Sequence, residues 1–186
     1  GGFMGTRCLS EEDIKARYIT PAITSAGWDI HKQIRLEYAF TVGRIILRGN
    51  ITARGKQKRT DYVLFYKINF PLAIVEAKDN NHAVGAGLQQ GIEYAKALDI
   101  PYVYASTGDA FVEQNLITGE VKELKLEEFP SPEVLYQRYL LFIIRYEYFL
   151  LMNYNIYRNN YENIVIYCCI YDKIKIVKMR NIPPII

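Results

Sequence analysis

Residues 72–78, with the sequence LAIVEAK, are the segment that most constrains the fold of this chain. The segment begins with four consecutive apolar residues, as expected for a central strand buried on both faces of a sheet. Two charged residues, Glu76 and Lys78, follow at alternate positions. Because side chains alternate along a strand, both project from the same face, about 7 Å apart at the backbone. A charged pair here is costly unless it is solvated, paired or bound to a metal ion.

The surrounding segments predict a mixed α/β sheet with flanking helices. Apolar residues at spacings of three and four indicate a helix over 82–99. Ser10 followed by Asp13 approximates a capping box, so a helix is expected over 9–23. Turn residues and apolar runs predict the strands: 61–67, 101–107, a hairpin over 111–124 turning at Thr118-Gly119, and two strands within 33–49 around a Val42-Gly43 turn. Residues 51–60 are expected to be a polar, basic connection.

The composition changes near residue 132. From Val134 onward there is no Ala, Gly, Ser or Thr, whereas nine of the chain's sixteen tyrosines lie there. We expect residues 1–6 to be a tag remnant, 7–132 to be the folded domain, and 133–186 to be a helical extension followed by an irregular tail rich in Tyr, Ile and Asn. Such a tail is equally consistent with sequence that is not native to the domain.

The distribution of charge excludes a broadly basic domain. The net charge is +3, but residues 1–133 hold 16 basic and 17 acidic residues, so any polyanion site must be local. The longest apolar run, residues 139–152, contains Arg145 and Glu147 and is too short to span a bilayer. We therefore expect no membrane partner.

The three cysteines, Cys8, Cys168 and Cys169, provide neither a disulfide framework nor a zinc-binding spacing. This usage favours a reducing, cytoplasmic setting. The first residues lack the basic and apolar regions of a signal peptide.

Two nucleotide-binding motifs are approached but not matched. Five residues separate Gly49 from Gly55, where a P-loop requires four, and Gln57 replaces the Ser or Thr that would hold magnesium. In residues 85–91, GAGLQQG, the third glycine of a dinucleotide fingerprint would fall at Gln90. Nucleotide binding is therefore the weaker interpretation of both segments.

The stronger candidate site combines Asp61, Glu76 and Lys78. Asp61 begins the strand before residues 72–78, and the short connection makes the two strands neighbours. Two carboxylates beside a lysine suit a hard divalent cation such as Mg²⁺. Such an ion could polarise a phosphodiester and activate water, while the lysine orients the nucleophile or offsets negative charge. A structural Glu–Lys pair at a strand end is an equally good explanation of the spacing alone.

Two further groups of residues bear on this choice. Gln90 and Tyr94 lie four apart and share one face of the expected helix, which by itself would be a solvated face. Basic residues precede Asp61 in a segment that by itself is typical of a solvated loop, but beside a metal site they would grip nucleic-acid phosphates: Arg54, Lys56, Lys58 and Arg59.

Taken together, these residues resemble the D…E-x-K…Q-x-x-x-Y pattern of PD-(D/E)xK nucleases with the RecB-type extra motif. More narrowly, residues 7–139 resemble the amino-terminal region of the R subunit of type I restriction–modification enzymes. The likeness is carried, in order, by residues 10–29, 38–49, 55–67, 71–111 and 129–139. The resemblance implies an α/β, restriction-endonuclease-like mixed sheet flanked by helices.

The resemblance also implies roles for individual residues. Asp61 and Glu76 would be catalytic metal ligands, together with the backbone carbonyl of Ala77, and Lys78 would be the catalytic lysine. The accessory residues would be Gln90, Tyr94 and the early helical acid Glu11. Thr60 stands where many members of the superfamily have proline before the aspartate.

By the same resemblance, the chain would be a type I site-specific deoxyribonuclease domain that cleaves double-stranded DNA with Mg²⁺, for which Mn²⁺ could substitute. Its partners would be DNA and the modification and specificity subunits. No Walker motif is present, so ATP would act on a motor region outside this sequence. The alternatives are a catalytically silent DNA-binding or assembly module of the same fold, and another PD-(D/E)xK nuclease such as a junction resolvase or repair nuclease.

Overall fold

The computed structural model describes residues 9–42, 56–79, 81, 84–157, 165–170 and 173–178. The chain forms two compact units, Gly1–Gln137 and Arg138–Ile186, and each is described by itself. The predicted site residues all belong to the first unit.

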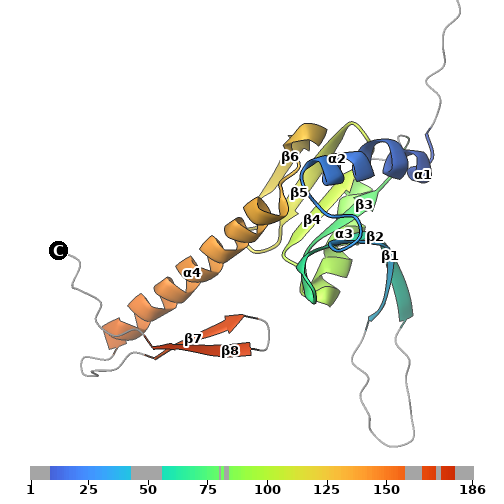
Figure 1. Cartoon of the computed structure of the whole chain (residues 1–186). Coiled ribbons are helices and arrows are strands. Elements are labelled where there is room, and N and C mark those ends of the chain that lie inside the picture. Colours follow the sequence, from blue (N-terminus) through green and yellow to red (C-terminus); the bar gives the residue numbers. More distant parts are fainter. Residues whose placement is uncertain are drawn as a thin grey trace, which may run out of the picture. The chain divides into compact units, whose positions relative to one another are not determined.

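The first unit is built on a six-stranded mixed sheet in the order β1-β2-β3-β4-β5-β6 (Figure 1). The pair β3 and β4 is parallel, and the other neighbouring pairs are antiparallel. The strand bounds are β1 Ile34–Val42, β2 Lys56–Lys67, β3 Phe70–Ala77, β4 Tyr102–Ser106, β5 Ala110–Asn115 and β6 Val121–Lys125. This arrangement confirms the expected mixed α/β sheet.

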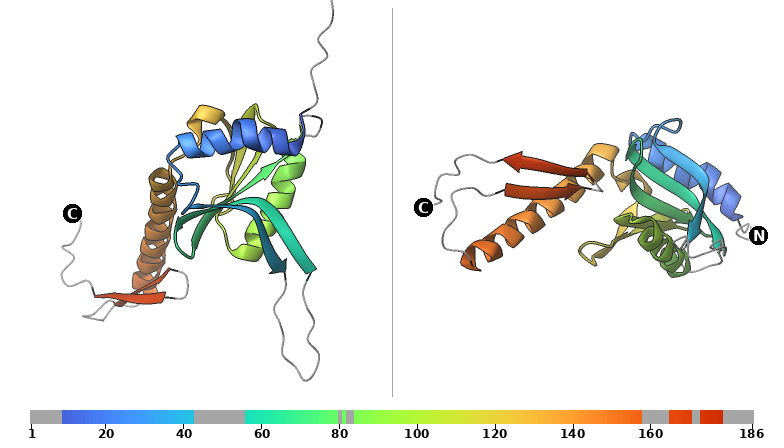
Figure 2. Two further views of the ribbon diagram at one scale, coloured as in Figure 1. Left: turned by 45° about the vertical axis from the view of Figure 1, so that its right-hand side comes forward. Right: turned by 90° about the horizontal axis from the view of Figure 1, so that it is seen from below.

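Helices flank the sheet. The segment α1 Glu11–Ile14, η1 Lys15–Ile19 and α2 Thr20–Ser25 lies on one side, and α3 Val84–Leu98 lies on the other (Figures 1 and 2). A hydrogen bond of 2.9 Å between Thr20 Oγ1 and the Tyr62 hydroxyl joins α2 to β2. Helix α3 is the crossover between the parallel strands β3 and β4, as that connection requires.

The amino-terminal helix contains a π turn that the sequence did not predict. Its start is the expected capping box of Ser10 and Asp13. The N–H of Thr20 then bonds the carbonyl of Lys15, five residues earlier, which defines the wider turn of η1. This turn ends just before Pro21, which has no N–H to continue the α-helical hydrogen bonding.

The expectation of a polar connection at 51–60 was wrong for its second half. Residues 56–60 belong to β2, which pairs antiparallel with β1, because their backbone continues the ladder from Val42 opposite Lys56 to Tyr38 opposite Thr60. Val42 is the last residue of β1, whereas Gly43 of the expected turn, the strand expected after it and Arg54 lie outside the described residues. The expected hairpin in the 111–124 region is confirmed, with Gly119 at φ 78° in its turn.

The remaining elements are helix α4, Pro132–Tyr157, which runs across the boundary between the units, and the antiparallel strands β7, Val165–Ile170, and β8, Lys173–Lys178. The helical extension was expected. The expectation of an irregular tail was wrong where these strands form, since Ile, Val and Tyr favour paired strands. Among the described residues, no helix is long and apolar enough to cross a membrane.

Helix α3 approaches the sheet closely because of two glycines one turn apart. A Cβ atom at Gly91 would stand 2.5 Å from Val103 Cγ1 and 3.3 Å from Glu76 Cγ. A Cβ atom at Gly87 would stand 3.0 Å from Lys78 Cγ. Gly87 and Gly91, within the segment that approaches a dinucleotide fingerprint, therefore let α3 pack closely against Glu76 and Lys78.

We expect Gly91→Ala to destabilise the domain by about 1–3 kcal/mol, because the added methyl group overpacks against Val103. Gly85→Ala is the matched control in the same helix, where a Cβ atom would meet nothing within 4 Å. It should be neutral or stabilising by up to about 1 kcal/mol. Urea unfolding of both variants tests this difference, and equal effects at the two positions would contradict the close packing.

Candidate active site

The carboxylate of Glu76 lies inside the protein near the end of β3. The residue is 1% exposed. One of its oxygens, Oε1, accepts a hydrogen bond from the Thr60 hydroxyl. The other, Oε2, accepts a hydrogen bond of 3.2 Å from the side-chain amide of Gln90. β2 and α3 therefore hold this carboxylate between them.

Burial raises the pKa of Glu76 to about 7, from an ordinary value of 4.5. The hydrogen bond from Thr60 and the charge of Lys78 oppose this rise, whereas the negative charge of Asp61 adds to it. A cation bound between these two carboxylates would offset both the burial and the repulsion that disfavour their charged forms.

Asp61 lies next to Glu76 and is also largely buried, with a side chain 15% exposed. Its Oδ2 accepts a hydrogen bond of 2.8 Å from the backbone N–H of Ala77. Its Oδ1 lies 3.3 Å from the ammonium of Lys15. The Ala77 contact joins β2 to the E-x-K segment of β3.

Lys78 follows β3 directly, and its backbone N–H donates to the carbonyl of Ser106. Its side chain is 16% exposed, and its Nζ lies 3.4 Å from Glu11 Oε1. The structure therefore brings Asp61, Glu76, Lys78, Glu11 and Gln90 together, from four segments of the chain.

Tyr94 lies one helical turn beyond Gln90 and forms part of the same wall. Its ring packs edge-to-face on Phe40, with ring centroids 5.2 Å apart. The ammonium of Lys58 stands 5.2 Å from the ring centroid of Tyr94 and 3.8 Å from Glu93. In the structure Tyr94 thus packs against Phe40 of β1 and Lys58 of β2.

Three of the four predicted DNA-binding residues, Lys56, Lys58 and Arg59, are on a strand and not in a loop. Lys56, Lys58 and Arg59 lie in β2, and the Arg59 guanidinium is 3.8 Å from Glu37. Adjacent residues of a strand face opposite sides, so Lys58 and Arg59 cannot both face α3. Their roles in DNA binding stay predictions.

The donor set suits magnesium. Two carboxylates and the Ala77 carbonyl would supply hard oxygen ligands, and Mg²⁺ commonly keeps several waters beside one or two carboxylates. Among the residues that the structure describes, no group of three or more His, Cys, Asp or Glu side chains is arranged to hold a metal ion. Water would complete the coordination. The direction of the Ala77 carbonyl stays a prediction.

Sequence reasoning missed three residues of this site. Thr60 was noted only as a departure from proline, yet its hydroxyl bonds Glu76. Lys15 and Glu37 lie 46 and 24 positions before Asp61 in the sequence, and their ion pair of 2.6 Å borders it. Burial by itself would lower the pKa of Lys15, but hydrogen bonds from its ammonium to Glu12 and Glu37 and the charge of Asp61 raise it. No motif spacing marked either residue.

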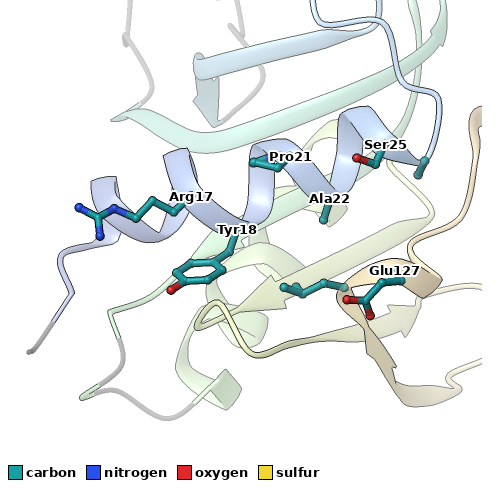
Figure 3. Close-up of a pocket in the computed structure, with 8 residues that line it drawn as sticks. Arg17, Tyr18, Pro21, Ala22, Ser25 and Glu127 are labelled. Carbon is teal, nitrogen blue, oxygen red and sulfur yellow. The ribbon is translucent and has the colours of Figure 1, made fainter. Parts of the chain in front are cut away.

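A separate depression of about 320 Å³ lies between the amino-terminal helices and η2, Leu126–Glu128. Figure 3 shows Tyr18, Pro21, Ala22 and Ser25 on the helical side of it and Glu127 on the other. Its lining is mostly apolar and includes none of the predicted site residues. The candidate active site is therefore defined by converging polar groups and not by this depression.

A mixed sheet between two helical layers, with Asp61 and the E-x-K segment at adjoining strands, defines an α/β fold of the restriction-endonuclease-like class. The chain belongs to the family of type I restriction enzyme R protein N termini, whose model matches residues 29–130.

Two comparisons agree with this assignment. The chain is 44% identical over 137 residues to the type I restriction enzyme EcoAI endonuclease subunit of Escherichia coli, covering 72% of this chain and 17% of that protein. It is similar, with a TM-score of 0.62 and 37% identity, to a fragment structure assigned to an HsdR subunit of a type I restriction enzyme from Vibrio vulnificus YJ016. That likeness covers 74% of this chain and 27% of the other. The chain thus spans less than a third of either relative.

Without divalent ions, we expect Glu76→Gln to stabilise the domain at about pH 8 and much less at about pH 5. The folded protein binds more protons than the unfolded chain between the pKa values of 4.5 and about 7, so stability present below this window is lost as pH rises through it. The shift corresponds to an upper bound of about 3 kcal/mol.

Urea unfolding in EDTA at the two pH values measures this effect. The control is Glu120→Gln, an exposed glutamate before β6, which should change stability equally at both. If the effect of Glu76→Gln on stability does not depend on pH, ionisation of Glu76 does not destabilise the folded protein, and the prediction is wrong.

Proposed function

We propose that this chain is the DNA-cleaving domain of a type I restriction–modification R subunit, an endonuclease that hydrolyses phosphodiester bonds with Mg²⁺, or with Mn²⁺ in its place. The observation that carries the proposal is the buried carboxylate of Glu76, which Thr60 and Gln90 hold beside Asp61 and Lys78. The alternative, a structural ion pair between Glu76 and Lys78, fits less well. Lys78 pairs with Glu11, and the buried Glu76 carboxylate accepts its hydrogen bonds from Thr60 and Gln90.

Each residue has a role in this reaction. Asp61 and Glu76 would hold the divalent ion, and Gln90 would keep the Glu76 carboxylate in place. The Lys78 ammonium would orient the attacking water and offset the negative charge that develops on the phosphate. When bound, the ion supplies Lewis acidity toward the phosphate and lowers the pKa of a water ligand.

The basic residues of β2 would bind the DNA backbone. Lys58 and Arg59 lie within three positions of Asp61 in the sequence. Lys58 contacts Tyr94 and Glu93, and the Arg59 side chain is 64% exposed. Lys56 would extend this contact along β2. Arg54, which lies outside the described residues, would also bind phosphate. Phosphate contacts of this kind position DNA without reading its sequence.

In the full complex, we propose that the modification and specificity subunits select the DNA and that ATP is used by a motor region beyond this chain. A cytoplasmic setting follows from that role. The domain by itself should show little sequence preference, since no described element resembles a helix that reads base edges.

The first test of the function is nicking of supercoiled plasmid in Mg²⁺ or Mn²⁺. We expect Lys78→Ala and Glu76→Ala each to slow nicking by at least about 100-fold, as loss of a proton-handling or charge-stabilising group does. Lys32→Ala is the control, because its side chain is 83% exposed and pairs with Asp29.

Metal-independent nicking, or nicking that survives both substitutions, would contradict the proposal. No nicking by the unsubstituted chain, with Glu76-dependent Mn²⁺ binding by calorimetry, would favour a domain that requires its motor. Absence of both nicking and Glu76-dependent Mn²⁺ binding would favour the catalytically silent module. Nicking that prefers branched over linear DNA would favour a junction resolvase.

The second test concerns DNA affinity in Ca²⁺, which should support binding without cleavage. We expect the Lys58→Ala, Arg59→Ala double variant to bind linear duplex more weakly and to reduce the slope of log K against log salt by about 2, since each phosphate contact contributes about 0.9. Lys125→Ala, an exposed lysine of β6 at the opposite edge of the sheet, is the control. Fluorescence anisotropy over a salt series measures the slope, and an unchanged slope would remove β2 from the DNA interface.

A further inference from the structure

Lys15 has an unusual position for a lysine, at the border of the candidate active site. The residue is only 8% exposed. Its Nζ lies 2.6 Å from Glu12 Oε1, 2.6 Å from Glu37 Oε1 and 3.3 Å from Asp61 Oδ1. An ammonium has three N–H donors, and here each has a carboxylate of its own.

The three carboxylates come from separate elements, α1, β1 and β2. Two local irregularities of the backbone allow them to meet. Lys15 is the first residue of the π turn η1, and single π turns occur frequently at functional sites. Glu37 has φ 49° in the middle of β1, a left-handed conformation that a non-glycine residue adopts at a cost. Such conformations persist where the surrounding contacts hold them.

The charge around Lys15 is that of a cation site. Three carboxylate oxygens, the kind of ligand that hard divalent ions prefer, converge on one point, although the described residues form no metal site there. The ammonium occupies that point. Asp61 is shared between the two sides, since its Oδ2 accepts the Ala77 N–H next to Glu76 while its Oδ1 faces Lys15.

We infer that Lys15 is a positioning residue whose ammonium takes the place of a second divalent cation beside Asp61. Asp61 and Glu76 then serve a single divalent ion, and Glu12 and Glu37 hold the ammonium instead of a metal. The inference rests on the proposed function for the first ion, but its test counts bound ions and does not require cleavage.

The test is the number of Mn²⁺ ions bound by the full chain, measured by calorimetry and by the electron paramagnetic resonance signal of free Mn²⁺. We expect one ion per chain for the unsubstituted protein and two for Lys15→Met, because removal of the ammonium leaves three carboxylates facing one another. Lys15→Met, Glu37→Gln should return to one ion.

The matched control is Arg17→Met, which removes one positive charge from the same helix. The Arg17 side chain is 61% exposed, extends outward in Figure 3 and pairs with Asp13 at 3.2 Å. Arg17→Met should therefore still bind one Mn²⁺ ion per chain. A change in folding alone would not add an ion, so the count separates this role from a purely structural one.

Several outcomes would overturn the inference: one ion in folded Lys15→Met, two ions in the unsubstituted protein, or two in the double variant. If Lys15→Met unfolds, Mn²⁺ should refold it and raise its melting temperature more than that of the unsubstituted chain. Failure of Mn²⁺ to do so would equally overturn it.

The proposed function can fail independently. No ion in the unsubstituted chain with one in Lys15→Met would remove the Asp61–Glu76 metal site while leaving Lys15 as a substitute cation. No ion in either would contradict both.

Discussion

The structure of the site depends on the burial of one carboxylate, that of Glu76. Placing a carboxylate inside a sheet costs free energy unless hydrogen bonds or a cation compensate. Thr60 and Gln90 supply hydrogen bonds from two different elements, and the glycines of α3 let the helix approach closely enough for Gln90 to do so. The Q-x-x-x-Y helix therefore fixes a carboxylate directly, in addition to forming a wall.

A second constraint arises where β1 and β2 pass Asp61. Thr60 contacts Glu76 on the α3 side, whereas Tyr62 bonds Thr20 of α2 on the other side, although regular alternation would put both on one face. Glu37, with its positive φ, lies between the two ladder pairs that flank this position. The irregularity leaves Asp61 between the faces, where it meets both the Ala77 N–H and Lys15.

Much of the site could be predicted because its residues lie at short, regular spacings in the sequence. Glu76 and Lys78 are two apart on a strand, Gln90 and Tyr94 are four apart on a helix, and a short connection joins the strands of Asp61 and Glu76. The partners of Tyr94 and the strand position of Lys58 could not be predicted in this way. They depend on the pairing of β1 with β2, which puts Phe40 opposite Lys58, and on the packing of α3, which brings Tyr94 to both.

The sequence by itself determined the mixed sheet, the order of its central elements and the Asp61, Glu76, Lys78 and Gln90 constellation, because alternation and helical periodicity act over a few residues. Only the tertiary structure decided how buried Glu76 is, which residue pairs with Lys78, and that Lys15 lies among Glu12, Glu37 and Asp61. Those features arise from contacts between residues as many as 67 positions apart, across a π turn and a left-handed glutamate that no local pattern predicts.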